Sequence, residues 1–283
     1  MADGRKTVFI GLVYYRDYLH GFAGAYRKLQ RCSRFSDTCI VINGDGIAEA
    51  DVRQAFGPLQ ENLHVLKHDN RGQEFGGYQA GLDFHRLGSD DAFDLVLAND
   101  TLGEHQKLFT AEFDAFRKTL AANPSGKVVG KIDHAQRLQS IGPLTSSRWV
   151  RSNLMGLDHE ALAKLRFRIY VPELEALVNE TDRESEFFSA EVGQTVQDRL
   201  RKWLFRPETH SWYGASRLDG GNAGRFAAKA RSILQEIHLS MRLNCEGMAF
   251  IAPRMSRSEQ RMIRVQRKVL SLGSLFARTS RAA

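Results

Sequence analysis

Strand-like and helix-like segments alternate along the first half of this chain, and the alternation restricts the fold more than any other feature of the sequence. Continuous apolar runs, typical of strands buried on both faces, cover residues 7–15, 38–42, 63–66, 93–98 and 127–133. Between them apolar residues recur at helical spacing, as in Leu19, Phe22, Tyr26 and Leu29. Such alternation builds βαβ units around a mostly parallel sheet. The sequence therefore predicts an α/β fold.

The second half of the chain has a mainly helical pattern. Apolar residues repeat every four positions from Phe188 to Leu204, and a further helix is expected from Phe226 to Met241, with Glu236 and His238 as buried polar partners. Residues 145–153 are polar, carry an aromatic residue and have no clean period. We expect residues 1–160 to form the sheet-bearing half, 161–250 a helical region of the same domain, and 251–283 a basic tail.

Composition indicates a globular cytoplasmic protein. The 283 residues carry a net charge of +7 and three cysteines without metal-type spacing, so reduced thiols are expected. There is no signal-peptide pattern and no apolar run long enough to span a bilayer. Nucleic-acid binding is not expected, because no zinc motif or RNA-binding signature accompanies the charge.

The basic charge is concentrated at the C-terminal end, where apolar residues are interleaved at near-helical spacing. This pattern fits an amphipathic helix on an anionic membrane surface, and equally a helix packed on its own domain. The basic residues are Arg254, Arg257, Arg261, Arg264, Arg267, Lys268, Arg278 and Arg281.

Two short motifs stand between the predicted strands. Residues 69–82 form a glycine-punctuated loop that runs into a helix expected to begin near Gly77, with its free amide groups directed at a ligand. The alternative is that the glycines serve only helix–sheet packing. Asn99, Asp100 and Thr101 end a buried strand, at the edge where parallel sheets bind ligands. The Asp100 carboxylate suits Mg²⁺ or Mn²⁺ bridging a diphosphate, so the pair of motifs predicts a nucleotide-sugar site.

The same residues resemble a known family. Asn70-x-Gly72-x-x-x-Gly76-Gly77-Tyr78-x-x-Gly81, followed by Leu95 to Thr101, is similar to GT-A-type glycosyltransferases, especially bacterial polysaccharide-synthesis enzymes of the rhamnan synthesis protein F kind. The resemblance covers about residues 7–160. It implies a GT-A-like, Rossmann-like sheet that binds a nucleotide-diphospho-sugar.

The resemblance also implies roles for individual residues. The positions that it assigns to the nucleotide-sugar are Tyr14, Tyr15, Asp45, Asn70, Arg71, Gly72, Gly77, Asn99 and Asp100. Asp100 and His210 are the implied metal ligands. The chain departs from the family in having Asn99-Asp100-Thr101 where Asp-x-Asp is usual. Metal dependence is therefore open, with Arg71 or Arg148 as alternative phosphate-binding cations.

Sugar transfer with inversion, also implied by the resemblance, needs a general base. Glu186 and Asp182, expected at the start of a helix, are candidates beside Asp133, although acidic residues are favourable in a first helical turn for structural reasons alone. The residues expected to form an acceptor or phosphate wall are Arg148, Trp149, Asn153 and Trp212.

The sequence thus favours a glycosyltransferase that acts on a glycan or lipid-linked acceptor in surface polysaccharide synthesis, in the cytoplasm or at the inner face of the membrane. The alternative is a catalytically silent nucleotide-binding or scaffold protein of a polysaccharide assembly system. A nucleotidyltransferase ranks last, because no basic glycine-rich loop follows the first strand.

Overall fold

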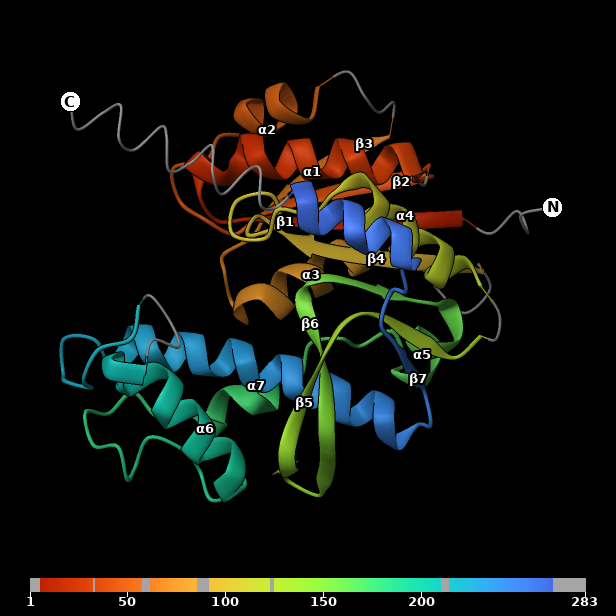
Figure 1. Ribbon diagram of the computed structural model, residues 1–283. Helices are drawn as coiled ribbons and strands as arrows, with labels where there is room; N and C mark the ends of the chain where they lie inside the picture. Colours follow the sequence, from red (N-terminus) through yellow and green to blue (C-terminus); the bar gives the residue numbers. More distant parts are fainter. Residues whose placement is uncertain are drawn as a thin grey trace.

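A seven-stranded sheet runs through the molecule (Figure 1). The computed structural model describes residues 6–32, 34–57, 62–85, 92–122, 125–209 and 214–266. The strand order is β3-β2-β1-β4-β6-β5-β7. The strands are β1 (Lys6–Val13), β2 (Asp37–Ile42), β3 (Leu63–Lys67), β4 (Phe93–Asn99), β5 (Lys127–Ile141), β6 (Leu144–Leu157) and β7 (Ala249–Ile251).

The first four strands form the parallel part of the sheet. Ile10 of β1 lies opposite Cys39 of β2 on one side and Leu97 of β4 on the other. Every residue of β4 is buried, which explains its continuous apolar run. Strand β6 pairs antiparallel with β4 and β5, and β7 pairs parallel with β5. The predicted mostly parallel α/β sheet is confirmed.

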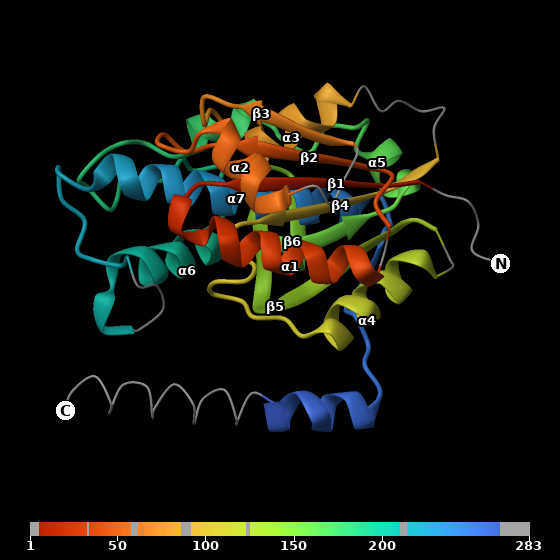
Figure 2. The ribbon, with the colours of Figure 1, turned by 90° about the horizontal axis from the view of Figure 1, so that it is seen from above.

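Helices cover both faces of the sheet (Figure 2). On one face, α1 (Leu19–Cys32), α2 (Glu49–Phe56) and α4 (Thr110–Ala121) share a core with β1 that contains Phe9, Phe22 and Phe113. On the other face, α3 (Gln73–Phe84), α5 (His159–Lys164) and part of α7 (Ala223–Cys245) share a second core that contains Ile10 and Tyr78. Each predicted amphipathic pattern in this half therefore faces the sheet.

A third core lies away from the parallel strands. The outer part of the β5–β6 hairpin packs there against the short helix Pro172–Leu177, α6 (Gln194–Phe205) and one face of α7 from Phe226 to Met241. This part of the chain is the helical extension predicted from sequence, and it occupies the lower part of Figure 1.

In this region one segment without a predicted element forms a strand, and one sequence expectation is wrong. Residues 145–153 belong to strand β6, and the turn at Gly142, which has φ +54°, marks a hairpin that the polar composition obscures. The four-residue repeat is helical only from Gln194. Phe188 and Val192 precede the helix and form β-bridges with Val178 and Ile141. Their apolar spacing reflects burial in the third core rather than helical winding.

The chain ends, within the described residues, in a helix over 257–266. Ile263 is buried, whereas Met262 and Val265 are 49% and 61% exposed. No helix among the described residues has the length and apolar character needed to cross a membrane.

Candidate functional site

The glycine-rich loop makes a tight turn into α3. Asn70, Gly72 and Gln73 all have positive φ. A Cβ added at Gly72 would lie only 2.4 Å from the ring of Tyr170, so a side chain there would overlap the ring. Helix α3 begins at Gln73, so the expectation of a start near Gly77 is wrong. Gly77 lies inside the helix and presents no free terminal amide.

The glycines inside α3 serve close packing. A Cβ at Gly81 would lie 2.6 Å from Ile10 of β1, and one at Gly77 would lie 2.7 Å from the side chain of Asn43. Helix α3 can therefore lie directly on the sheet and still leave room for Asn43. The packing interpretation of these two glycines holds, and it also connects them to the site.

Asn43 organises a small cleft at the carboxyl ends of β1, β2 and β3. Its Nδ2 donates to Tyr14 Oη at 3.0 Å and to the Gln73 carbonyl at 2.9 Å, and its Oδ1 lies 2.9 Å from His68 Nδ1. We call this space, of about 350 Å³, the small cleft; it is lined by Tyr14, Tyr15, Asn43, Gly44, Asp45, His68, Asp69 and Asn70. Four predicted nucleotide residues, Tyr14, Tyr15, Asp45 and Asn70, thus meet in one place.

An aromatic group borders the small cleft. The ring of Tyr15 packs on Tyr18 with centroids 5.0 Å apart, and Tyr18 packs edge-on against His105 at 5.1 Å. Tyr15 is nevertheless 53% exposed. This group offers a flat, partly solvent-facing surface on which another ring can stack.

Asp100 connects the end of β4 to the end of β1. Its side chain is 1% exposed, and Oδ2 accepts hydrogen bonds from the backbone N–H groups of Tyr14 at 2.6 Å and Tyr15 at 2.9 Å. Burial raises the pKa of Asp100 to about 6, against the lowering effect of these two bonds. The carboxylate therefore fixes the wall of the small cleft and is not an open strand-end group.

The residues around Asp100 do not fit a metal centre in this conformation. One carboxylate oxygen is already occupied by two N–H donors. Across the described parts of the chain, no group of three His, Cys, Asp or Glu side chains is arranged to hold a metal ion. The other predicted ligand, His210, and the predicted wall residue Trp212 lie outside the described residues.

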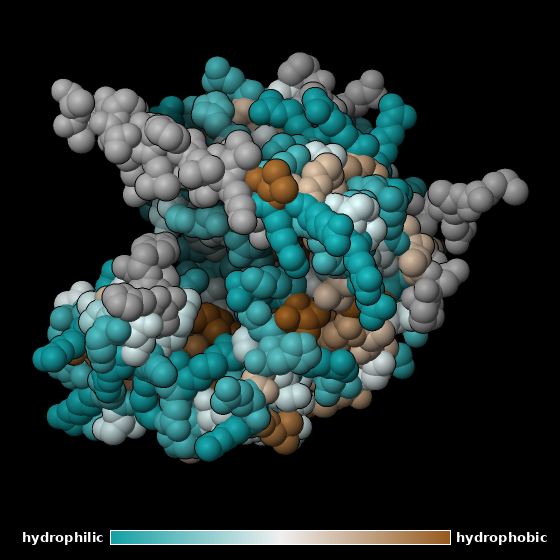
Figure 3. Space-filling model, in the orientation of Figure 1, coloured by the Kyte–Doolittle hydropathy of each residue, from teal (hydrophilic) through white to brown (hydrophobic). Residues whose placement is uncertain are grey.

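A larger cleft of about 630 Å³ opens beside Asn99, between the parallel strands and the α6–α7 end of the molecule, where Figure 3 shows a hollow. We call it the large cleft. Its lining residues are Glu74, Asn99, Thr101, Gln106, Asp133, His134, Trp149, Arg151, Ser152, Asn153, Arg199, Leu200, Trp203, Lys229, Ile233 and Glu236. Asn99 lines the large cleft and its neighbour Asp100 holds Tyr14 of the small cleft, so the two spaces adjoin at this motif.

Three cations from separate elements reach the large cleft. Arg151 of β6 forms a two-pronged ion pair with Asp133 of β5, at 2.6 and 3.2 Å. Arg199 of α6 lies 3.9 Å above the ring of Trp149, and burial lowers its pKa. Lys229 of α7 is the third cation. These three cations line the large cleft together with the Asp133 carboxylate.

Two carboxylates that the sequence analysis did not place in the site also line the large cleft. Glu74 Oε1 accepts hydrogen bonds from Asn99 Nδ2 at 2.6 Å and Tyr78 Oη at 3.2 Å. Glu236 Oε2 accepts from both the backbone N–H and the hydroxyl of Ser152, each at 2.7 Å. Burial raises the pKa of Glu236, while the bonds from Ser152 lower it.

A weak sequence signal could have identified Glu236. It is the only acidic residue of α7, and Lys229, Ile233 and Glu236 recur at the spacing of one helical face. That face is the one that α7 presents to the cleft. The sequence alone gives no indication of which residues lie opposite this face of α7.

The remaining predicted residues are divided between the cleft and other surfaces. Trp149, Asn153 and Asp133 line the large cleft. Arg148, in contrast, donates to Asn244 and lies 4.6 Å from the centre of the Phe250 ring. Arg71 is exposed, and neither it nor Arg148 lines either cleft.

Asp182 and Glu186 also lie outside both clefts. Their segment is a turn and not the start of a helix, and Glu186 pairs with Arg183 at 3.0 Å on the surface. Helix α6 begins later, at Gln194. The first-turn position that motivated their selection therefore does not exist.

No protein-family model matches the chain, and no curated protein matches it significantly. Among solved structures, a 4-diphosphocytidyl-2C-methyl-D-erythritol synthase is similar at 10% identity and TM-score 0.39, over 58% of this chain and 80% of that one. The galactosyltransferase LgtC, in complex with donor and acceptor sugar analogs, gives 10% identity and TM-score 0.36, over 59% of this chain and 62% of LgtC.

The bifunctional glycosyltransferase WbbM, in its apo form, gives 8% identity and TM-score 0.35, over 58% of this chain and 33% of WbbM. The chain thus spans less than two thirds of LgtC and about a third of WbbM. All of these similarities are distant, and the function proposed below rests on the residues of the site.

Proposed function

We propose that this chain is a glycosyltransferase that takes a sugar from a nucleotide-diphospho-sugar. The observation that carries the proposal is a pair of clefts connected by the Asn99-Asp100 motif at the carboxyl edge of the parallel strands: Asn99 lines the large cleft, and Asp100 holds the backbone of Tyr14, which lines the small cleft. The small cleft is lined by tyrosine, amide and histidine side chains and by Asp45 and Asp69, without a lysine or arginine among its described residues, whereas the large cleft is lined by cations and carboxylates. A nucleotide-sugar is divided in the same way, into a flat base with its ribose and a charged diphosphate with its sugar.

The small cleft suits the nucleoside. Tyr15 provides a face for the base, and Asp45 provides an acceptor for ribose or base donors. Asn70 Oδ1 is buried and has no hydrogen-bond partner within the described residues, so a bound donor group would satisfy it.

The large cleft suits the diphosphate and the acceptor. Arg151, Arg199 and Lys229 can hold phosphate oxygens, taking the part first expected of Arg71 or Arg148. Mg²⁺ or Mn²⁺, if bound, would supply further neutralisation of the leaving diphosphate. The three cations of the large cleft support this assignment.

Within the large cleft, Glu236 is the best placed general base. Its Oε2 is held by Ser152, while Oε1 receives no hydrogen bond from any described residue. In the proposed step an acceptor hydroxyl transfers its proton to Oε1 as its oxygen attacks the anomeric carbon. The bond from that carbon to the diphosphate breaks, and the nucleoside diphosphate leaves with the electron pair. Attack opposite the leaving group inverts the anomeric centre.

The acceptor side of the proposal is a glycan or lipid-linked molecule in surface polysaccharide synthesis, at the inner face of the membrane. The helix over 257–266 supports this location, because it exposes Met262 and Val265 beside Arg257, Arg261 and Arg264. Such a surface can contact anionic lipids without spanning the bilayer.

One observation favours a second candidate, a silent nucleotide-binding scaffold protein. Asn99 and Asp100 are occupied by hydrogen bonds within the protein, and Asn99 Oδ1 accepts from Thr101. Because these hydrogen bonds stabilise the loop after β4, Asn99 and Asp100 can be retained in a protein that has no catalytic activity. Nucleotide binding without any turnover would support this candidate.

The deciding experiment is a thermal-shift screen of the purified chain against UDP-, GDP-, dTDP- and CDP-sugars, each with and without Mn²⁺. A ligand that binds only the folded state raises the melting temperature by mass action. We expect one nucleotide to give a shift. No shift with any of them, on well-folded protein, would contradict donor binding.

A further inference from the structure

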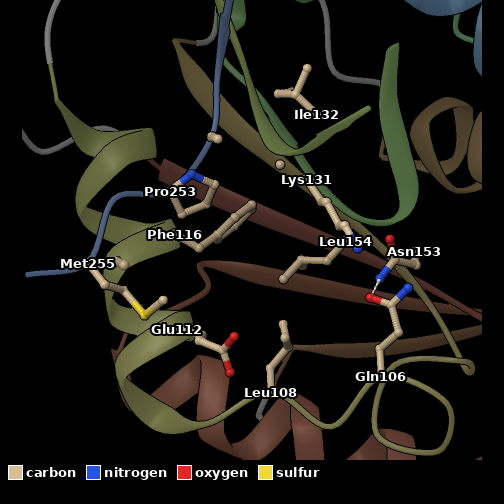
Figure 4. A pocket seen from close by; sticks show the side chains of 13 residues that line it. Gln106, Leu108, Glu112, Phe116, Lys131, Ile132, Asn153, Leu154, Pro253 and Met255 are labelled. Carbon is tan, nitrogen blue, oxygen red and sulfur yellow. Dashed lines mark hydrogen bonds between the residues drawn. The ribbon is translucent and has the colours of Figure 1, made fainter. Parts of the chain in front are cut away.

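An apolar pocket lies beside the large cleft, against α4 (Figure 4). Its volume is about 270 Å³. We call it the apolar pocket; its walls are Gln106, Leu108, Glu112, Ala115, Phe116, Gly130, Lys131, Ile132, Asn153, Leu154, Ala252, Pro253 and Met255. They come from α4, the β5–β6 hairpin, the loop after β4 and the segment after β7.

Strand pairing fixes the outer wall. Strand β7 pairs in parallel with β5, with Ala249 opposite Lys127 and Ile251 opposite Val129. The chain that follows β7 then places Ala252, Pro253 and Met255 along the pocket. The sheet thus anchors the chain immediately before this wall.

The apolar pocket and the large cleft share two residues, Gln106 and Asn153. The Asn153 amide donates to Gln106 Oε1, as the dashed line in Figure 4 marks, so this hydrogen-bonded pair belongs to the lining of both spaces. Asn153 Oδ1 is buried and has no hydrogen-bond partner among the described residues. A buried amide oxygen without a partner is costly, and a donor from a ligand would satisfy it.

The loop after β4 connects the small cleft to the apolar pocket. It begins at Asp100, whose carboxylate accepts a hydrogen bond from Tyr14 of the small cleft, and it continues to Gln106 and Leu108, which line the apolar pocket. A molecule that occupies both the large cleft and the apolar pocket must have a polar end, a hydrogen-bonding neck and an apolar end.

We propose that the apolar pocket binds the apolar part of an amphiphilic acceptor, with Asn153 Oδ1 accepting a hydrogen bond from a hydroxyl at its neck. This inference rests on the proposed function and specifies its acceptor class. The pocket is larger than a cavity of about 150 Å³ that holds benzene. It therefore takes a ring or a short alkyl segment, and not a whole lipid chain.

The test uses the full chain and a series of β-D-glucopyranosides with methyl, butyl, hexyl and octyl groups, below their micellar concentrations. Binding is measured by isothermal titration calorimetry. Each methylene that enters an apolar site is expected to tighten binding about fourfold. The gain should stop once the pocket is full. Affinity that does not depend on chain length would overturn the proposal.

Two variants fill the pocket from opposite sides. Ala115→Leu adds bulk from α4, and Ala252→Trp adds it from the exposed segment after β7. Each should weaken binding of the hexyl glucoside more than tenfold and leave the methyl glucoside unchanged. Ala121→Leu, at the exposed end of α4, is the matched control.

If Ala115→Leu fails to fold, Ala252→Trp decides the question, because its position is exposed. If octyl glucoside binds the filled variants as tightly as the wild type, its binding site lies elsewhere, for example on the C-terminal helix or between two copies of the chain. That result would refute the pocket assignment.

The nucleotide-sugar screen, repeated on the same proteins, separates the two proposals. If a nucleotide binds but the affinity for the glucosides does not change with alkyl length, only the acceptor pocket is refuted. An alkyl series that depends on the pocket, without nucleotide binding, would refute the proposed function and with it the role of the amphiphile as an acceptor.

Discussion

The small and large clefts adjoin at one edge of the sheet, but they are assembled in different ways. The small cleft is lined by three short segments, residues 14–15, 43–45 and 68–70, which directly follow β1, β2 and β3. The large cleft draws residues from Glu74 to Glu236, supplied by α3, the loop after β4, the β5–β6 hairpin, α6 and α7.

The difference shows why one cleft is easier to find than the other. Parallel strands bring their carboxyl ends together by topology, so residues that follow successive strands must converge. A hairpin and two helices from the second half can be placed in many ways, and their side chains meet only after packing. Substitutions in and around the two clefts test this contrast, and the largest effect is expected at Glu236.

Glu236→Gln should have the largest effect. Removal of the proposed base is expected to lower the rate of transfer by about 10²- to 10⁴-fold, measured as release of nucleoside diphosphate. Nucleotide binding by thermal shift should persist, because Glu236 does not line the small cleft, which is proposed to hold the nucleoside. Asp133→Asn is the comparison, with a smaller loss expected because Asp133 is paired with Arg151. The reverse order of effects would assign the base to Asp133.

Asp100 should make stability depend on pH. Its pKa is about 6 in the folded protein and 3.8 ordinarily, so its stabilising contribution is present below about pH 4 and is lost as the pH rises through 6. The rise in the pKa of Asp100 from 3.8 to about 6 corresponds to on the order of 3 kcal/mol of unfolding free energy. Urea unfolding of the wild type and Asp100→Asn from pH 4 to pH 7 measures this loss. A constant difference between the two proteins would contradict the burial of an ionisable carboxyl.

Gly77→Ala should disturb the small cleft through packing. The added Cβ would lie 2.7 Å from the Asn43 amide and 2.8 Å from Leu12, so we expect destabilisation of about 1–3 kcal/mol and weaker nucleotide binding. Gly24→Ala in α1 is the matched control. Apart from its chain neighbours and the backbone of its own helix, no atom of the described residues lies within 4 Å of the added Cβ, and the change should be neutral or stabilise by about 0.4–1 kcal/mol. Denaturant unfolding distinguishes the two, and equal effects would mean that Asn43 can move aside.

The double substitution Asp182→Asn with Glu186→Gln should have the smallest effect. Both side chains lie outside the clefts, and the partner of Glu186 is a surface arginine. Transfer rate and unfolding midpoint should match the wild type. A clear loss of activity with unchanged stability would restore these residues as catalytic candidates.

The sequence by itself determined the parts of this protein that depend on local chemistry. Apolar runs predicted the parallel strands, because strands buried on both faces have no polar face. Glycines marked the turn into α3 and its close approach to β1, and Asn99-Asp100-Thr101 marked the end of β4. Topology then placed Tyr14, Asp45 and Asn70 together.

Only the tertiary structure decided the large cleft. Ser152 meets Glu236 across 84 positions of sequence, and Arg199 meets Trp149 only because α6 packs against the β5–β6 hairpin. Arg148 is directed to Asn244 on α7 and away from its neighbour Trp149, since successive residues of a strand point to opposite faces. Local periodicity does not encode which helix will cover which strand, because that choice is made by the shared burial of the third core.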